Sequence, residues 1–110
     1  MDVLVDWENI SWNEPEEGEE RPGYRDKSCV RDGLEVWLVE MTEGYVKDEW
    51  CTERHLVYVL EGEASMRFKD GSVIRMRQGD TGVIPASEAN PHKMEVSAGE
   101  RIVGLFFDQP

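Results

Sequence analysis

Glycines, most of them preceded by a polar or acidic residue, recur along the chain and cut it into short segments. The pairs that predict turns are Asp32-Gly33, Glu43-Gly44, Glu61-Gly62, Asp70-Gly71, Gln78-Gly79 and Ala98-Gly99. Between them lie runs rich in β-branched and aromatic residues, several with the period of two of a strand. No segment carries a sustained helical stripe. Turns spaced by about eight to twelve residues predict an all-β sandwich or small barrel.

The predicted strands span residues 34–41, 56–60, 63–69, 73–77, 81–84, 92–96 and 101–107, with residues 3–5 as a further short strand and residues 24–30 ambiguous. Residues 56–60 are apolar throughout, which predicts a strand buried on both faces that ends at the Glu61-Gly62 turn. A chain of 110 residues fits one domain. Within it, residues 1–28 are expected to form an acidic N-terminal arm and loop, anchored by Trp7, Ile10 and Trp12, and residues 29–110 the barrel.

The charge of the chain is negative and unevenly distributed. The formal net charge is -12, and residues 1–20 hold eight of the 24 acidic residues and no Lys or Arg. Such a surface repels phosphate backbones and anionic lipids, so neither nucleic acid nor a membrane is an expected partner. The two cysteines, Cys29 and Cys51, are too few for a disulfide framework, and no secretory signal or membrane span is evident. A reduced, cytoplasmic protein is predicted.

The stretch of residues 48–63 concentrates metal-donor side chains. Glu49, Cys51, Glu53 and His55 fall within seven positions. On an extended strand residues 49 and 51 would project to one face, about 7 Å apart. His92 shares its parity with Met94 and Val96, so it is expected to face the same side as apolar residues.

The spacing of these residues resembles the two motifs of the cupin superfamily. Gly62 matches the glycine that closes the first motif, which puts His55 at the glutamate position and Glu49 and Cys51 at the two histidine positions. The second motif is matched by Gly79-Asp80, Pro85 and His92, after a short hairpin over residues 63–78. The spacing of the first motif is kept, whereas each of its ligand types has changed.

A narrower resemblance is to a small cupin group named for an Asp-His-Cys-Trp motif. It is carried by Gly44-Tyr45, by Asp48-Glu49-Trp50-Cys51 and by His55, with Glu49 where that group has histidine and Arg54 where it has glycine. The resemblance covers about residues 34–107. It implies an RmlC-like jelly roll, that is, a double-stranded β-helix barrel, which commonly pairs as a homodimer through sheet edges.

The predicted site is metal-binding, with ligands drawn from Glu49, Cys51, His55 and His92. Glu49, His55 and His92 alone would leave open positions suited to Fe(II), with Mn, Ni or Zn as alternatives. Cys51 as a fourth ligand would close a tetrahedron around Zn, which suits a structural role. Considered one at a time, these residues have a second interpretation: Cys51 as a small buried hydrophobic residue, and His92 as a histidine of the core.

Side chains expected at the cavity mouth are Trp37, Tyr45, Tyr58, Arg75 and Arg25, with the arginines suited to a carboxylate or phosphate. Three functions remain open. The first is a metal-dependent enzyme acting on a small molecule, anionic or aromatic, held in the barrel. The second is a binding or sensory module without chemistry, and the third is a dimer with structural zinc. The sequence identifies no reaction.

Overall fold

The computed structural model describes residues 3–15, 18, 21–45 and 49–108. In these ranges the regular secondary structure is almost entirely β, and the all-β prediction is confirmed. The elements are η1 (Trp7–Asn9), β1 (Tyr24–Arg31), β2 (Leu34–Thr42), β3 (His55–Phe68), β4 (Val73–Arg77), β5 (Thr81–Ile84), β6 (His92–Glu95) and β7 (Arg101–Asp108). The segment 24–30, ambiguous in sequence, is a full strand paired with β2 along its whole length.

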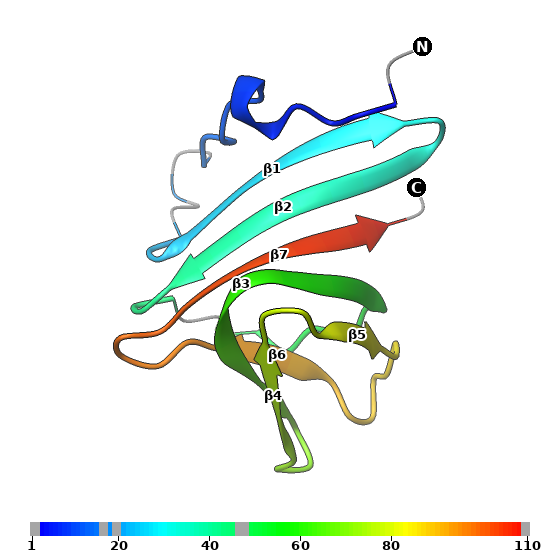
Figure 1. Ribbon diagram of the computed structural model, residues 1–110. Coiled ribbons are helices and arrows are strands. Elements are labelled where there is room, and N and C mark those ends of the chain that lie inside the picture. The colour runs from blue at the N-terminus through cyan, green and yellow to red at the C-terminus, as the bar shows by residue number, and fades with distance from the viewer. Residues whose placement is uncertain (1–2, 16–17, 19–20, 46–48, 109–110) are drawn as a thin grey trace.

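Two antiparallel sheets share strand β3. The large sheet contains β1, β2, β7, the first half of β3 and β5, and the small sheet contains β4, the second half of β3 and β6. Figure 1 shows β1, β2 and β7 as one layer, from which β3 curves toward β4 and β6. The two sheets enclose the interior as a jelly roll, as the resemblance implied.

Gly62 allows β3 to pass from one sheet to the other. It has φ +77°, and a Cβ there would lie 1.8 Å from the carbonyl oxygen of Arg101. The register with β7 shifts between Val59 and Glu61. The predicted strand end at Glu61-Gly62 is therefore wrong: β3 continues through a bulge. A glycine with positive φ serves a turn or a bulge equally, and only the pairing with β7 decides which forms.

Part of the interior is filled by aliphatic side chains, and we call it the packed region. It consists of Val57, Val59, Ala64, Met76 and Ile102, all at most 5% exposed. A void of only about 10 Å³ lies beside Val57, Met76 and Ile102, no larger than the minimum that holds one water.

The prediction that residues 56–60 are buried on both faces is wrong. Val57 and Val59 point inward, but Leu56 and Tyr58 are 40% and 39% exposed on the outer face of the large sheet. Outward apolar residues hide the alternation of this strand in the sequence, so an apolar run does not report burial here.

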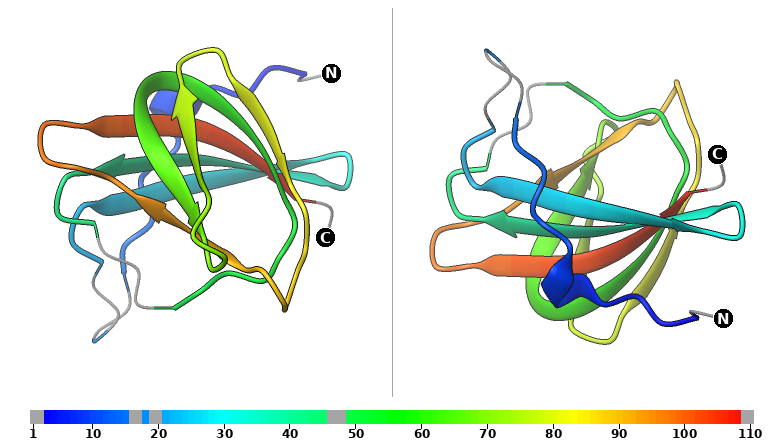
Figure 2. Two further views of the ribbon diagram at one scale, coloured as in Figure 1. Left: turned by 90° about the horizontal axis from the view of Figure 1, so that it is seen from below. Right: turned by 90° about the horizontal axis from the view of Figure 1, so that it is seen from above.

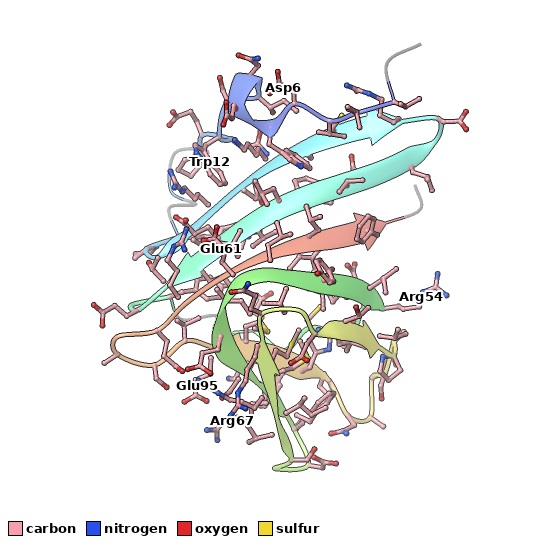
Figure 3. All side chains as sticks on the ribbon, in the orientation of Figure 1. Asp6, Trp12, Arg54, Glu61, Arg67 and Glu95 are labelled. Carbon is pink, nitrogen blue, oxygen red and sulfur yellow. The ribbon has the colours of Figure 1, made fainter. Side chains whose placement is uncertain are left out.

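The N-terminal arm lies against β1, as expected. The Lys27 ammonium donates hydrogen bonds to the carbonyl oxygens of Trp7 (2.6 Å) and Ile10 (3.2 Å). The Arg25 guanidinium carbon lies 3.9 Å from the Trp12 ring centroid. The arm is seen beside β1 in Figure 2, and Trp12 is labelled in Figure 3. Residues 3–5 are not a strand.

The sheet starts at Tyr24, whereas the barrel is predicted to begin at residue 29. The division of the chain into an arm and a barrel at that position stays a prediction. Part of the acidic loop (residues 16–17 and 19–20) and Asp48 of the donor-rich stretch lie outside the described residues. In the ranges that are described, no helix is long and apolar enough to pass through a membrane.

Candidate functional site

Three potential metal ligands converge from three parts of the chain. Cys51 lies in the loop before β3, His55 opens β3 and His92 opens β6. One ligand atom from each lies within 4.8 Å of the others. The Cys51 Sγ and the His55 Nε2 are 3.2 Å apart. We call these three residues the Cys-His-His group.

Backbone pairing brings Cys51 beside His92. The Cys51 amide donates to the His92 carbonyl (2.7 Å), and the His92 amide donates to the Cys51 carbonyl (3.0 Å). Residues that exchange both hydrogen bonds across an antiparallel pair project their side chains to the same face. His55, opposite Ile84 on β5, supplies the third donor from the adjoining sheet.

Aromatic contacts orient both imidazoles. The His55 ring meets the His92 ring edge-on, with centroids 5.2 Å apart, and meets the Phe106 ring in the same manner at 5.7 Å. His92 is only 4% exposed, and its ring lies 6.2 Å from that of Phe68. Edge-on ring contacts and burial hold the two imidazoles in place.

The donor types of the Cys-His-His group suit a transition metal, and one of its ligand pairs has nearly the separation found in a metal site. Thiolate and imidazole ligands bind at about 2.3 and 2.0–2.1 Å in tetrahedral sites, which places the ligand atoms about 3.3–3.6 Å apart. The 3.2 Å between Cys51 Sγ and His55 Nε2 is close to that value. Three protein ligands leave a fourth tetrahedral position for water or a substrate.

The structure does not bring Glu49 and Glu53 into the group. Both residues are exposed, and neither belongs to the donor cluster found among the described residues. The parity argument for residues 49 and 51 assumed an extended strand. The structure instead has bends at Glu49 and Glu53 and an isolated bridge at Cys51.

The group lies on the wall of a cavity of about 240 Å³. The wall combines aromatic, methionine and a few charged side chains: Arg21, Tyr24, Asp26, Trp37, Val39, Met41, Tyr45, Cys51, His55, Met66, His92, Lys93, Met94 and Phe106. Trp37 and Tyr45, expected at the cavity from the sequence, both line it.

The other residues expected at the cavity lie elsewhere. Tyr58 is on the outer face of the large sheet. The Arg75 guanidinium contacts Ser65, Glu63 and Glu100 and borders a separate groove between β4 and β5. Arg25 pairs with Glu40 at 2.7 Å and stacks on Trp12.

Burial dominates the electrostatics of the two tyrosines on the wall, whose rings are 5.3 Å apart. Burial raises the pKa of Tyr45; the nearby Arg21 charge acts in the opposite direction, and Cys51 reinforces the rise. Burial also raises the pKa of Tyr24, together with the hydrogen bond that its hydroxyl donates to Asp26 (2.7 Å). Both phenols therefore stay neutral near pH 7.

Several lining residues, among them Arg21, Tyr24, Lys93 and Phe106, are not singled out by the sequence analysis. They come from β1 and its approach, from β6 and from β7. Arg21 and Tyr24 belong to a stretch read as loop or as ambiguous, and Lys93 has the parity opposite to His92. No local sequence signal identifies them.

Comparison with known proteins identifies a family. The family model described as the EutQ-like cupin domain matches residues 31–101. Among curated proteins, none matches the sequence significantly.

Solved structures of low sequence identity share the fold. The polyketide cyclase RemF from Streptomyces resistomycificus superposes with a TM-score of 0.76 at 19% identity, over 97% of this chain and 78% of that chain. A cupin-superfamily sugar phosphate isomerase from Silicibacter pomeroyi gives a TM-score of 0.72 at 19% identity, over 94% and 73%. The Clostridium difficile EutQ protein gives 0.63 at 18% identity, over 79% and 68%.

Proposed function

Because the chain belongs to the EutQ-like cupin domain family, we propose that it is a small metal-binding cupin that acts on a small molecule in its cavity. Cys51, His55 and His92 are the proposed ligands of a divalent transition metal, with Zn and Fe as the leading candidates and Ni or Mn as alternatives. The observation that carries the proposal is the convergence of these three donors within 4.8 Å on the wall of one cavity.

The number of ligands favours a reactive site over structural zinc. Structural zinc sites are closed by four protein ligands, whereas catalytic sites keep one position open. The described residues offer three donors and leave Glu49 exposed. Once bound, a metal at such a site supplies Lewis acidity toward a substrate oxygen. The protein's own contribution is to hold that substrate among Trp37, Tyr45 and Phe106 and to shield it from water.

The two cysteines bear on the cell compartment. Both Cys29 and Cys51 are free thiols. A thiol ligand is preserved in a reducing compartment, so the proposed site is consistent with the cytoplasmic location expected from the sequence.

The test is the metal content of protein purified under reducing conditions and then offered Zn, Fe(II), Ni and Mn in turn. We expect one metal per chain in the wild type and loss of that metal in Cys51→Ala and in His92→Ala. Cys29→Ala is the matched control, because Cys29 is buried away from the cavity beside Arg31, whose guanidinium donates to its Sγ at 2.8 Å. Glu49→Gln is also expected to retain the metal.

Each alternative predicts a different result. A wild type that binds none of the four metals rejects the proposal. If Glu49→Gln loses the metal, Glu49 is a fourth ligand beside Cys51, His55 and His92. Water-proton relaxation of the Mn-loaded protein then tests the open position: a site with no exchanging water supports structural zinc.

We further propose that two copies pair through the outer face of the large sheet. Strand register aligns Phe107, Leu56 and Val83 in one row across β7, β3 and β5, and all three are exposed, as is the neighbouring Tyr58. The row carries no charge, so two copies with a net charge of -12 can meet there without opposing carboxylates.

Sedimentation of Val83→Glu tests this pairing. The substitution is expected to shift the wild-type dimer to monomer, whereas Val73→Glu, at another exposed valine, on β4, leaves the dimer intact. A monomeric wild type rejects the pairing and leaves the metal proposal untouched.

A further inference from the structure

Most arginines in the described part of this acidic protein are neutralised by glutamates. The ion pairs are Arg25 with Glu40, Arg67 with Glu95, Arg75 with Glu63 and Glu100, Arg77 with Glu63, and Arg101 with Glu40 and Glu61. Figure 3 shows one of these pairs, Arg67 and Glu95, at the surface. With twice as many acids as bases in the sequence, 24 against 12, a cation facing no carboxylate requires an explanation.

The two cations that line the cavity contact aromatic rings. The Arg21 guanidinium carbon lies 5.3 Å from the Tyr24 ring centroid. The Lys93 ammonium lies 4.3 Å from the Trp50 ring centroid. No ion pair joins either cation to a carboxylate of the described residues. A ring positions a cation without cancelling its charge, so with respect to the described residues both cations remain able to attract an anion.

Two observations place the Arg21 charge at the cavity. Arg21 is one of the lining residues, and its charge opposes the rise in pKa of both Tyr24 and Tyr45. The guanidinium therefore acts electrostatically on the Tyr24 and Tyr45 hydroxyls of the wall, from the segment that precedes β1.

Asp26 is the carboxylate on the same wall, and its oxygens have partners. One accepts a hydrogen bond from the Tyr24 hydroxyl at 2.7 Å, and the other accepts one from the Asn13 side-chain amide at 2.9 Å. These two contacts direct the Asp26 oxygens toward Tyr24 and Asn13, and among the described residues no ion pair joins Asp26 to Arg21 or Lys93.

The remaining wall is apolar. Trp37, Tyr45 and Phe106 supply flat surfaces, and Met41, Met66 and Met94 supply adaptable ones. A volume of about 240 Å³ lies below the ~300–1,000 Å³ of sites that take drug-sized ligands. A cavity of this size and lining suits a small molecule with one charged end and one apolar body.

We propose that the cavity binds a small carboxylate with an aromatic or short apolar body, whose carboxylate is held by Arg21 and Lys93. The planar guanidinium matches a carboxylate through two parallel hydrogen bonds, and the ammonium adds a point charge. The body then lies among Trp37, Tyr45 and Phe106, toward the Cys-His-His group. The inference rests on the proposed small-molecule site and does not require the metal.

The experiment is calorimetric titration of metal-stripped and metal-loaded protein with phenylacetate, benzoate and hexanoate. Phenylacetamide is the neutral control of the same shape, and phenyl phosphate is the alternative anion. Arg21→Gln and Lys93→Gln are compared with Arg54→Gln, an exposed arginine outside the cavity lining whose side chain points away from the body in Figure 3.

Stripped wild-type protein is expected to bind phenylacetate at least about ten-fold more tightly than phenylacetamide, since charge-assisted hydrogen bonds are lost with the amide. Arg21→Gln removes this preference, Lys93→Gln reduces it, and Arg54→Gln preserves it. Equal affinity for acid and amide, no binding of any of the three carboxylates, or an unchanged preference in Arg21→Gln overturns the inference. Tighter binding of phenyl phosphate than of every carboxylate overturns the choice of carboxylate.

Failure of this inference and failure of the metal proposal give distinct results. Cys51→Ala, which is expected to lose the metal, should still bind phenylacetate. A wild type that binds phenylacetate but no metal rejects only the metal centre. A wild type that binds metal but shows no preference for acid over amide rejects only the carboxylate.

Discussion

The packed region and the cavity occupy the same barrel interior and differ in what fills them. The packed region is aliphatic and leaves a void of about 10 Å³, whereas the cavity is aromatic and leaves about 240 Å³. Close packing of small aliphatic side chains stabilises the fold. Flat rings and imidazoles, fixed at the other wall by edge-on contacts, leave room for a ligand. The two parts adjoin, because Val39, Met41, Met94 and Phe106 line both the void and the cavity.

The strand β3 connects the two parts. Its first residue, His55, belongs to the Cys-His-His group, while Val57, Val59 and Ala64 belong to the packed region. Substitutions along this strand and beside it therefore separate loss of folding from loss of binding.

The largest expected effect is at the bend of β3. Gly62→Ala should lower the free energy of unfolding by more than about 3 kcal/mol, because a Cβ 1.8 Å from the Arg101 carbonyl oxygen adds overlap to the strain of a positive φ. Gly71→Ala is the matched control. Gly71 also has a positive φ, but a Cβ there meets nothing within 4 Å, so the cost is about 1–2 kcal/mol. Urea unfolding measures both, and equal losses would show that the contact with Arg101 is unimportant.

The second effect concerns the cavity alone. A metal at one hundred times its dissociation constant should stabilise the wild type by about 2.7 kcal/mol. Cys51→Ala should lose this gain while its metal-free stability changes by less than about 1 kcal/mol. Thermal unfolding with and without metal checks this. A large metal-free loss would show that Cys51 serves the core and would remove the separation between the two regions.

The third effect concerns the packed region alone. Val59→Ala should cost about 2 kcal/mol, because Val59 is fully buried and its truncation leaves a cavity. Val83→Ala, at a valine 73% exposed, should stay within about 0.5 kcal/mol. Metal content per folded Val59→Ala chain should equal that of the wild type. Loss of metal in this variant would show that the packed region and the metal site depend on each other.

The smallest effect is expected at Glu40, on the outer surface beside the bend of β3. Glu40 accepts hydrogen bonds from Arg25 and Arg101. Arg101 also pairs with the nearby Glu61, which is labelled in Figure 3. Burial raises the pKa of Glu40, but the two arginines outweigh it and hold that pKa below the ordinary 4.5. A lowered pKa stabilises the fold above the ordinary value, and this contribution disappears as the pH falls through the folded-state pKa. Glu40→Gln should therefore cost about 1 kcal/mol at pH 7, since the arginines are half-exposed.

Urea unfolding at pH 7 and at pH 3 measures the difference between Glu40→Gln and the wild type. The difference is expected to shrink at pH 3. A constant difference would mean that the Glu40 charge contributes nothing to stability. Metal content should be the same in both proteins, because Glu40 does not line the cavity.

Much of the fold was predictable because its signals are local. Residues 34–41, 73–77 and 81–84 were assigned correctly from alternation and flanking turns, and each differs from the observed strand by at most one residue. Two of the errors have causes that are not local. The burial of residues 56–60 depends on what covers the outer face of the sheet, and the role of Gly62 depends on the pairing with β7. No local pattern reports either.

The sequence by itself determined the all-β class and the cupin motif positions, and it predicted Glu49, Cys51, His55 and His92 as metal donors, because donor type and spacing along the chain are properties of the sequence. Only the tertiary structure decided that Cys51 joins His55 and His92 while Glu49 stays exposed, since Cys51 pairs with His92 and the loop bends at Glu49 and Glu53. It also placed Arg21 and Lys93, 72 residues apart in the sequence, on one cavity. Local signals fix which residues are present and how they alternate, whereas closure of the two sheets fixes which of them meet.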